Sequence, residues 1–148
     1  MGKKRVAEKT EEELIKEAEK LGKKRELKIK LKAPIKEGRV YIFSSYNNTI
    51  MTLTDLKGNT IFWSSAGKEG FRGTKQGTPY AASKVAETVA EAINQLGIER
   101  VEVFIKGIGS GRESALRTLA AKGVNIVLIK DVTPIPHDGP RPPKVRRV

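Results

Sequence analysis

The most regular hydrophobic pattern in the chain predicts a helix over residues 78–96. One apolar stripe with spacings of four, four and three residues runs along this segment, and it consists of Val85, Val89, Ile93 and Leu96. Thr78 can cap the first backbone amides with its hydroxyl, and Pro79 falls at the first helical position, where a missing N–H costs nothing. Gly97 supplies the left-handed residue with which many helices end. The pattern therefore predicts the helix together with both of its ends.

Shorter apolar runs before this helix predict three β-strands. The strands are expected at residues 39–45, 49–54 and 60–64. Residues 46–48 are expected to form a tight turn because Asn tolerates a positive φ, and residues 55–59 are expected to form a second turn. Links this short join antiparallel neighbours, so the segment predicts a meander. The aromatic residues in these strands are expected mainly in the core, and they are Tyr41, Phe43, Phe62 and Trp63.

The pattern after the helix predicts a further strand–helix–strand continuation. Strands are expected at residues 100–106 and 124–132, with a helix at residues 111–122 between them. Ser110 and Glu113 have the spacing of a capping box, in which the two residues satisfy each other's backbone amides. Such a unit places its strands in parallel with a right-handed crossover. The fold class expected for the whole is α/β, with a mixed five-stranded sheet flanked by helices.

Two charged segments flank this part of the chain. Residues 1–37 are about half charged and include a short predicted helix over residues 11–24. Residues 23–32 alternate, which fits either an edge strand or an extended arm laid on RNA. Residues 133–148 hold five of the seven prolines and are expected to form a stiff, extended arm. The sequence thus divides into an N-terminal extension, a core at residues 38–132 and a C-terminal arm.

The charge balance points to a polyanionic partner. The chain has 29 Lys and Arg against 17 Asp and Glu, a formal net charge of +12, which attracts nucleic acid first and acidic lipid surfaces second. It has no Cys, so disulfides and thiolate zinc sites are excluded, and its single His leaves no cluster for a metal. The longest apolar run is too short to span a bilayer, and the N-terminus lacks the apolar core of a signal peptide. We expect a soluble, intracellular, basic protein.

Residues 66–77 form a Gly-rich basic loop that leads into the helix at residues 78–96. Glycines allow close backbone approach, and the cations Lys68, Arg72 and Lys75 can neutralise phosphates. The start of a helix also favours anions, because its first amides are exposed. The loop is therefore interpreted as a phosphate-contacting segment, and a flexible solvated loop is the alternative.

The segment KGIGSGRE at residues 106–113 is a second Gly-rich stretch before a helix. Its G-x-G-x-G spacing departs from the G-x-G-x-x-G of dinucleotide sites, although Asp131 lies about where such sites carry an acid. The segment can bind a phosphate of the RNA backbone with Arg112 nearby, or it can be a turn whose glycines allow tight packing of strand against helix. The acidic residues of the core show no pair placed as a metal nuclease requires, so no enzyme and no cofactor is expected.

Several long runs together resemble one known family. The runs YNNTIMTLTDLKGNTIFWSSAGKEGFRG, TPYAAS, VEVFIKGIGSGRESALRTL and IKDVTPIPHDGPRPPKVRRV occur in this order within residues 38–148. They closely resemble the family of the eleventh protein of the small ribosomal subunit, in its bacterial or organellar form. Three positions depart from the family pattern: the usual GPGPGRE reads GIGSGRE, an Asn is replaced by Asp138, and a Cys by Pro140.

This resemblance implies a ribonuclease-H-like three-layer α/β fold without nuclease activity. It also implies a place on the platform of the small subunit, where the protein binds rRNA near the mRNA exit and E-site region. The neighbours that it implies are the small-subunit proteins numbered seven, eighteen and, in bacteria, often twenty-one. The RNA-binding positions carried over by matching motif are Asn47, Asn48, Lys68, Arg72, Lys75, Arg112, Arg117, His137, Arg141, Lys144, Arg146 and Arg147.

Two further hypotheses come from other classes of protein. The first is a nucleotide-binding enzyme that uses the GIGSG segment. The second is an RNA chaperone or regulator that acts outside the ribosome. The basic arms and the resemblance favour the structural ribosomal protein over both.

Overall fold

The structure is a computed structural model that describes residues 35–141 and residue 143. The helix expected at residues 11–24 and the alternating segment at residues 23–32 lie outside the described residues. So do three of the RNA-binding positions, namely Lys144, Arg146 and Arg147.

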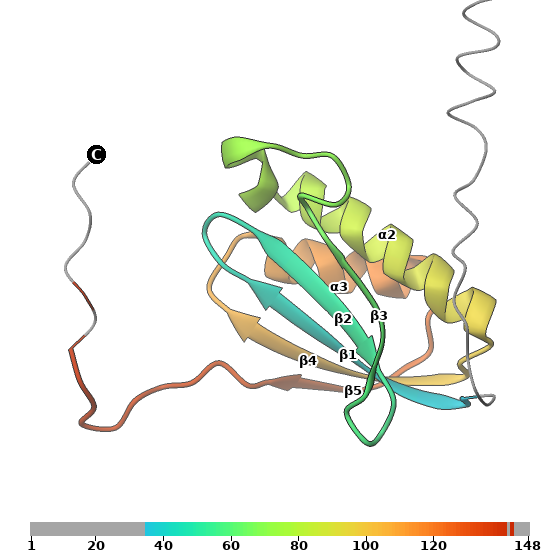
Figure 1. The fold of residues 1–148 in the computed structure, drawn as a ribbon. Coiled ribbons are helices and arrows are strands. Elements are labelled where there is room, and N and C mark those ends of the chain that lie inside the picture. Colours follow the sequence, from blue (N-terminus) through green and yellow to red (C-terminus); the bar gives the residue numbers. More distant parts are fainter. Residues whose placement is uncertain (1–34, 142, 144–148) are drawn as a thin grey trace, which may run out of the picture.

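The helices and strands follow the predicted order (Figure 1). The meander consists of β1 (Glu37–Ser44), β2 (Thr49–Thr54) and β3 (Thr60–Ser65). It is followed by the 3-10 helix η1 (Gly73–Gly77), α2 (Pro79–Leu96), β4 (Arg100–Gly107), α3 (Gly111–Ala121) and β5 (Ile126–Asp131). Every strand and both long helices lie within two residues of the expected bounds. Beyond β5, the described part of the C-terminal arm forms neither helix nor strand, as its prolines predict, and it runs away from the sheet.

The five strands form one mixed sheet in the order β3-β2-β1-β4-β5. β1 pairs antiparallel with β2 and parallel with β4, and the outer pairs are β2 with β3, antiparallel, and β4 with β5, parallel. The predicted meander and the parallel strand–helix–strand unit are therefore both confirmed. β1 lies at the centre of the sheet, which explains why its inward side chains are fully buried.

Both long helices cover the same face of the sheet (Figure 1). α2 packs on β2 and β3, α3 packs on β1 and β4, and the two helices pack against each other. The reason lies in the strand order: the connections β3–α2–β4 and β4–α3–β5 both move across the sheet in the same direction. Right-handed crossovers in one direction place their helices on one face. The α/β class and the mixed sheet are thus confirmed, whereas residues 35–141 form two layers and contain no second helical layer on the other face.

The core lies between the helices and the covered face of the sheet. The strands contribute alternate side chains such as Val40, Ile42 and Val103, which are at most 1% exposed. The predicted stripe of α2 faces this layer: Val85, Val89 and Ile93 are buried and Leu96 is half-buried. Transfer of each such side chain out of water contributes about 1.5–3 kcal/mol.

Three of the four strand aromatics are not in this core, so that prediction is wrong for them. Phe62 is buried, but Tyr41, Phe43 and Trp63 are exposed. Successive side chains of a strand point to opposite faces. These three residues belong to the face that neither long helix covers, and we call it the open face of the sheet.

The ends of the helices show one confirmed cap and one wrong prediction. The hydroxyl of Thr78 accepts from the amide of Ala81 at 3.3 Å, and Gly97 is left-handed with φ +68°. The capping box at the start of α3 is absent, because the hydroxyl of Ser110 donates instead to the carbonyl of Gly77 and Glu113 pairs with Arg117. A tertiary contact has therefore replaced the local one.

Candidate nucleic-acid interface

Four strands end at the same edge of the sheet, which we call the carboxyl edge. β1, β3, β4 and β5 all finish there, and α2 and α3 both begin there (Figure 1). Three connections meet at this edge: the turn at residues 45–48, the basic loop at residues 66–77 and the Gly-rich segment at residues 107–110. Six of the nine sequence-predicted RNA-binding residues that the structure describes therefore come from one end of the molecule, although they are far apart in the chain.

Direct contacts hold these three connections together. The amide of Gly109 donates to the carbonyl of Ser44 at 3.0 Å, and the hydroxyl of Ser110 donates to the carbonyl of Gly77 at 2.9 Å. A methyl group added at Gly77 would lie 2.2 Å from the carbonyl oxygen of Tyr46. The basic loop thus packs directly on the turn, and the edge is one continuous surface.

The glycines of the GIGSG segment serve close packing. A β-carbon on Gly109 would lie 2.2 Å from the carbonyl oxygen of Ser45, and one on Gly111 would lie 2.5 Å from the hydroxyl of Thr49. No side chain fits at these distances. The packing interpretation of this segment is therefore confirmed. The segment packs against the end of β1, which leaves no space there for the phosphates of a dinucleotide.

The two asparagines of the turn at residues 45–48 do not adopt the positive φ that the sequence predicts for them. Asn47 is exposed and Asn48 is half-buried. Among the described residues, Asp138 is the one non-glycine with a positive φ, so the predicted reason for Asn in this turn is wrong. The turn is held instead by Ser45, whose hydroxyl donates to the carbonyl of Asn48 and accepts from its amide, each at 3.1 Å.

The basic loop has a defined structure of its own. The side chain of Gln76 donates to the carbonyl of Phe71 at 3.0 Å, and the rings of Phe71 and Tyr80 meet edge to face with centres 5.8 Å apart. Lys68 donates to the carbonyl of Trp63 at 2.8 Å, so its ammonium is fixed at the rim of the sheet. Arg72 and Lys75 are exposed. The loop therefore holds three cations at the carboxyl edge.

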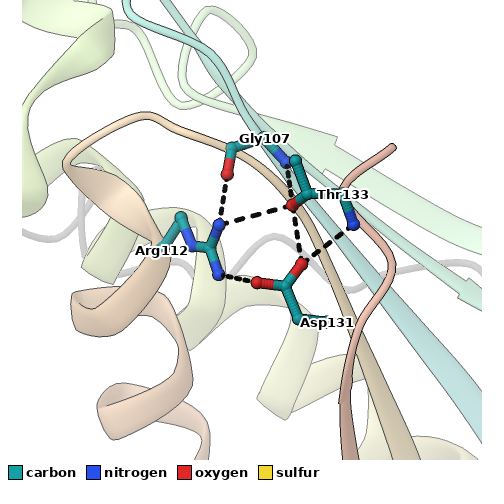
Figure 2. Close-up of polar contacts among 4 residues, drawn as sticks. All are labelled: Gly107, Arg112, Asp131 and Thr133. Atoms are coloured by element: carbon teal, nitrogen blue, oxygen red, sulfur yellow. Dashed lines mark hydrogen bonds and ion pairs between the residues drawn. The ribbon is translucent and has the colours of Figure 1, made fainter. Parts of the chain in front are cut away.

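Arg112 takes part in an internal network rather than extending into solvent (Figure 2). Its guanidinium donates to the carbonyl of Gly107 and to the carboxylate of Asp131. The amide and hydroxyl of Thr133 donate to the other oxygen of that carboxylate at 2.9 and 2.6 Å, and the amide of Gly107 donates to the hydroxyl at 3.2 Å. We call these four residues the arm latch, because Thr133 is the first residue of the C-terminal arm.

The arm latch shifts the titration of its carboxylate. Hydrogen bonds from Thr133, and then from Arg112, hold the pKa of Asp131 well below its usual range. The carboxylate is therefore charged whenever the protein is near neutral pH, and the guanidinium of Arg112 is partly neutralised by it. Asp131 lies about where a dinucleotide site carries its acid, but the oxygens of this carboxylate are occupied by donors from Arg112 and Thr133.

The remaining predicted residues lie apart from the three connections. Arg117 lies on the exposed side of α3 and forms an ion pair with Glu113 one turn earlier. His137 and Arg141 are exposed along the arm, which leaves the body at the carboxyl edge (Figure 1). Asp138 adopts φ +54°, a conformation that Asn and Asp tolerate, next to Gly139.

Sequence reasoning missed two features of this region. The first is the role of Thr133, although the pair Asp131 and Thr133 has the two-residue spacing at which a carboxylate binds a following backbone amide. The second is the open face, whose signal is the alternation of Arg39, Tyr41 and Phe43 along β1. A charged residue in that series indicates a face in contact with solvent.

A membrane-spanning helix and a metal cluster are both absent from residues 35–141 and 143. No helix in this part of the chain combines the length and the apolar character that crossing a membrane requires. The same residues contain no group of three or more His, Cys, Asp and Glu placed to hold a metal ion.

Comparison with known proteins agrees with the resemblance seen in the sequence. The family model described as ribosomal protein S11 matches residues 38–147. A protein of Solibacter usitatus (strain Ellin6076) named small ribosomal subunit protein uS11 is 54% identical over 129 residues, which cover 87% of this chain and 96% of the relative. A protein of the same name from Endomicrobium trichonymphae is 54% identical over 110 residues, covering 74% of this chain and 84% of the relative. On this evidence the chain is a member of the ribosomal protein S11 family.

Proposed function

We propose that this chain is a structural protein of the small ribosomal subunit that binds rRNA through its carboxyl edge and its C-terminal arm. The observation that carries the proposal is the gathering of the basic loop, the starts of α2 and α3 and the root of the arm at one end of the sheet. The family is one of structural, non-enzymatic proteins, and membership in it confirms the expectation that the chain is not an enzyme.

The mechanism is phosphate neutralisation on a rigid surface. Lys68, Arg72 and Lys75 project from a loop that is packed on its neighbours, so little conformational entropy is lost when RNA binds. The first amides of α2 and α3 add partial positive charge at the same edge. Each phosphate contact releases counterions, which makes the affinity fall with salt.

The arm latch sets the direction in which the arm leaves the core. Thr133 is tied to Gly107 and Asp131, so the arm begins from a fixed point beside the basic loop. Beyond it, His137 and Arg141 follow in a proline-rich segment. Arg112 then supports RNA binding by positioning the arm, in addition to any contribution of its charge.

The proposed position of the protein within the small subunit, and its proposed neighbours, follow from the family resemblance. It supports a seat on the platform near the mRNA exit and E-site region, in a cytoplasmic ribosome. It also supports contact with the small-subunit proteins numbered seven, eighteen and twenty-one. Cross-linking of the assembled subunit followed by mass spectrometry tests these neighbours, and cross-links to other proteins alone would contradict them.

A charge-matched pair of triple variants tests the RNA-binding edge. We expect replacement of Lys68, Arg72 and Lys75 by Ala to weaken binding to small-subunit rRNA. The slope of log K against log salt should fall by about 2–3, because each lost phosphate contact removes about 0.7–0.9. The control replaces Lys36, Lys57 and Lys122, which are exposed at the opposite end of the sheet. Equal slopes for the two variants would show that net charge acts without a defined edge.

A further inference from the structure

The open face of the sheet carries a row of aromatic rings. The strand register aligns Trp63, Thr52, Tyr41, Phe104 and Lys130 side by side across all five strands. The rings of Tyr41 and Phe104 are stacked with centres 5.1 Å apart and planes 17° apart. Phe43 lies in the next row toward the carboxyl edge, and it is 43% exposed while Trp63 is 51% exposed. No helix among the described residues covers this face (Figure 1).

The charges on the open face are predominantly positive. Its two acids, Glu37 and Glu102, form ion pairs with Arg100 and Arg39 respectively. Lys106 is paired in register with Phe43, and Lys130 with Phe104. Neither lysine forms an ion pair with another residue in the part of the chain that the structure describes. Aromatic rings and these two lysines therefore lie side by side on the open face.

A cation also lies directly beside Trp63, the most exposed ring of the open face. The ammonium of Lys68 is 4.9 Å from the centre of the Trp63 ring. Lys68 belongs to the basic loop, and its ammonium, which is also 4.8 Å from the centre of the buried Phe62 ring, lies at the margin where the carboxyl edge meets the open face. A base stacked near Trp63 would have its own phosphate within reach of this ammonium.

We propose that the open face is a binding surface for single-stranded RNA, with unpaired bases stacked on Phe43, Trp63 and the Tyr41–Phe104 pair. The proposal rests on the proposed function and deepens it, because it assigns unpaired nucleotides to the sheet and duplex phosphates to the carboxyl edge. Flat aromatic rings on a sheet accept bases of any sequence, since every base has a π face. The adjacent lysines supply the neutralisation that the connecting phosphates require.

A protein partner is the competing occupant, and the charge pattern argues against it. The two acids of the open face are already paired, so the free charge presented to a partner is that of Lys106 and Lys130. A protein that buried this face would have to place carboxylates opposite both lysines or bury them unpaired, which is costly. RNA supplies the complementary charge at every nucleotide.

The single tryptophan of the chain makes the proposal directly measurable. Trp63 is the only Trp in the sequence, so the tryptophan fluorescence of the full-length protein reports on the surroundings of this one ring of the open face. We expect a mixed-sequence single-stranded RNA of 12 nucleotides to quench this fluorescence, and the 12-base-pair duplex of the same sequence to leave it unchanged. Anisotropy of labelled RNA in the same samples reports binding anywhere on the protein.

A matched pair of variants separates stacking from general apolar contact. Phe43→Leu removes a ring but keeps an apolar side chain, and we expect it to weaken binding of the single strand at least about fivefold, with an unchanged salt slope. Phe43→Tyr should restore binding. Leu128→Val is the control, because Leu128 lies on the open face with the same 43% exposure and has no ring.

The outcomes distinguish this proposal from the proposed function. If rRNA binds but neither quenching nor an effect of Phe43→Leu is seen, the open face is not an RNA surface, while the carboxyl edge still accounts for binding. If Trp63 is shielded from acrylamide in the free full-length protein, a protein segment already covers the face and the proposal is wrong. Loss of rRNA binding in a double variant of Arg72 and Lys75 to Ala, which leaves Lys68 in place beside Trp63, tests the proposed function independently of both results.

Discussion

Single residues at the carboxyl edge act through the groups that surround them. Asp131 illustrates this, because its carboxylate receives donors from α3 and from the beginning of the arm. Arg112 has a charge that RNA would attract, yet its guanidinium is directed to Asp131 and Gly107 (Figure 2). The chemical type of a side chain thus predicts what it can bind, whereas its neighbours decide whether it is available.

The stability contributed by the arm latch depends on pH in a defined direction. The folded-state pKa of Asp131 is lowered below its unfolded value of about 3.9, so its contribution is complete above that pH and is lost as the pH falls below it. We expect Asp131→Asn to lower the urea midpoint at pH 6, and the difference from wild type to shrink below about pH 4. The exposed helical acid Glu91 provides the control as Glu91→Gln. A difference that stays constant down to pH 3 would contradict the assignment.

A glycine substitution tests the close packing at the same edge. Gly109→Ala places a methyl group 2.2 Å from a backbone carbonyl oxygen, so we expect it to lower the free energy of unfolding by about 1–3 kcal/mol or more. In Gly67→Ala the nearest atom is the side-chain nitrogen of Gln76 at 3.1 Å, which need move only a few tenths of an ångström and can keep its bond to Phe71, so a smaller loss of at most about 1 kcal/mol is expected. Urea unfolding of the two variants measures both values, and equal losses would contradict the packing role of Gly109.

At the scale of elements, the direction of the two crossovers decides what each face of the sheet does. β3–α2–β4 and β4–α3–β5 move the same way across the sheet, so both helices bury one face and leave the other open. The same topology brings the starts of both helices to the edge where the basic loop lies. One topological feature therefore produces the core, the carboxyl edge and the open face.

The cap of α2 is the element-level interaction that the sequence predicted most directly. We expect Thr78→Ala to lower the free energy of unfolding by about 1 kcal/mol, because the amide of Ala81 loses its hydroxyl acceptor. Thr78→Ser should restore most of this stability. Thr74→Ala, at an exposed position of η1, is the control. If the Thr78 and Thr74 variants unfold at the same urea concentration, the cap contributes nothing measurable.

For the molecule as a whole, the core and the arm make separable contributions. We expect deletion of residues 134–148 to weaken rRNA binding, because it removes the arm's cations, and to leave the core folded. The truncation ends after Thr133, so the arm latch is retained. Filter binding measures the affinity, and thermal unfolding followed by circular dichroism is the control for folding. Binding as tight as that of the full chain would show that the arm is not part of the interface.

The sequence by itself determined the elements, their bounds to within two residues and the family. Its apolar periods placed five strands and two helices, because local spacing sets which side of each element is buried. The division into residues 1–37, 38–132 and 133–148 and the twelve RNA-binding positions remain predictions. The capping box failed because Ser110 found a tertiary acceptor in Gly77.

Only the tertiary structure decided which surfaces are available. Tyr41, Phe43 and Trp63 are of residue types that are usually buried. They are exposed because α2 and α3 both pack on the other face of the sheet. Likewise, the GIGSG segment allows either a phosphate-binding turn or a tightly packed turn by its sequence, and the packing of Gly109 on Ser45 shows the second. The physical reason is that burial and hydrogen bonding depend on the partners brought together by strand order and register, which a local pattern does not contain.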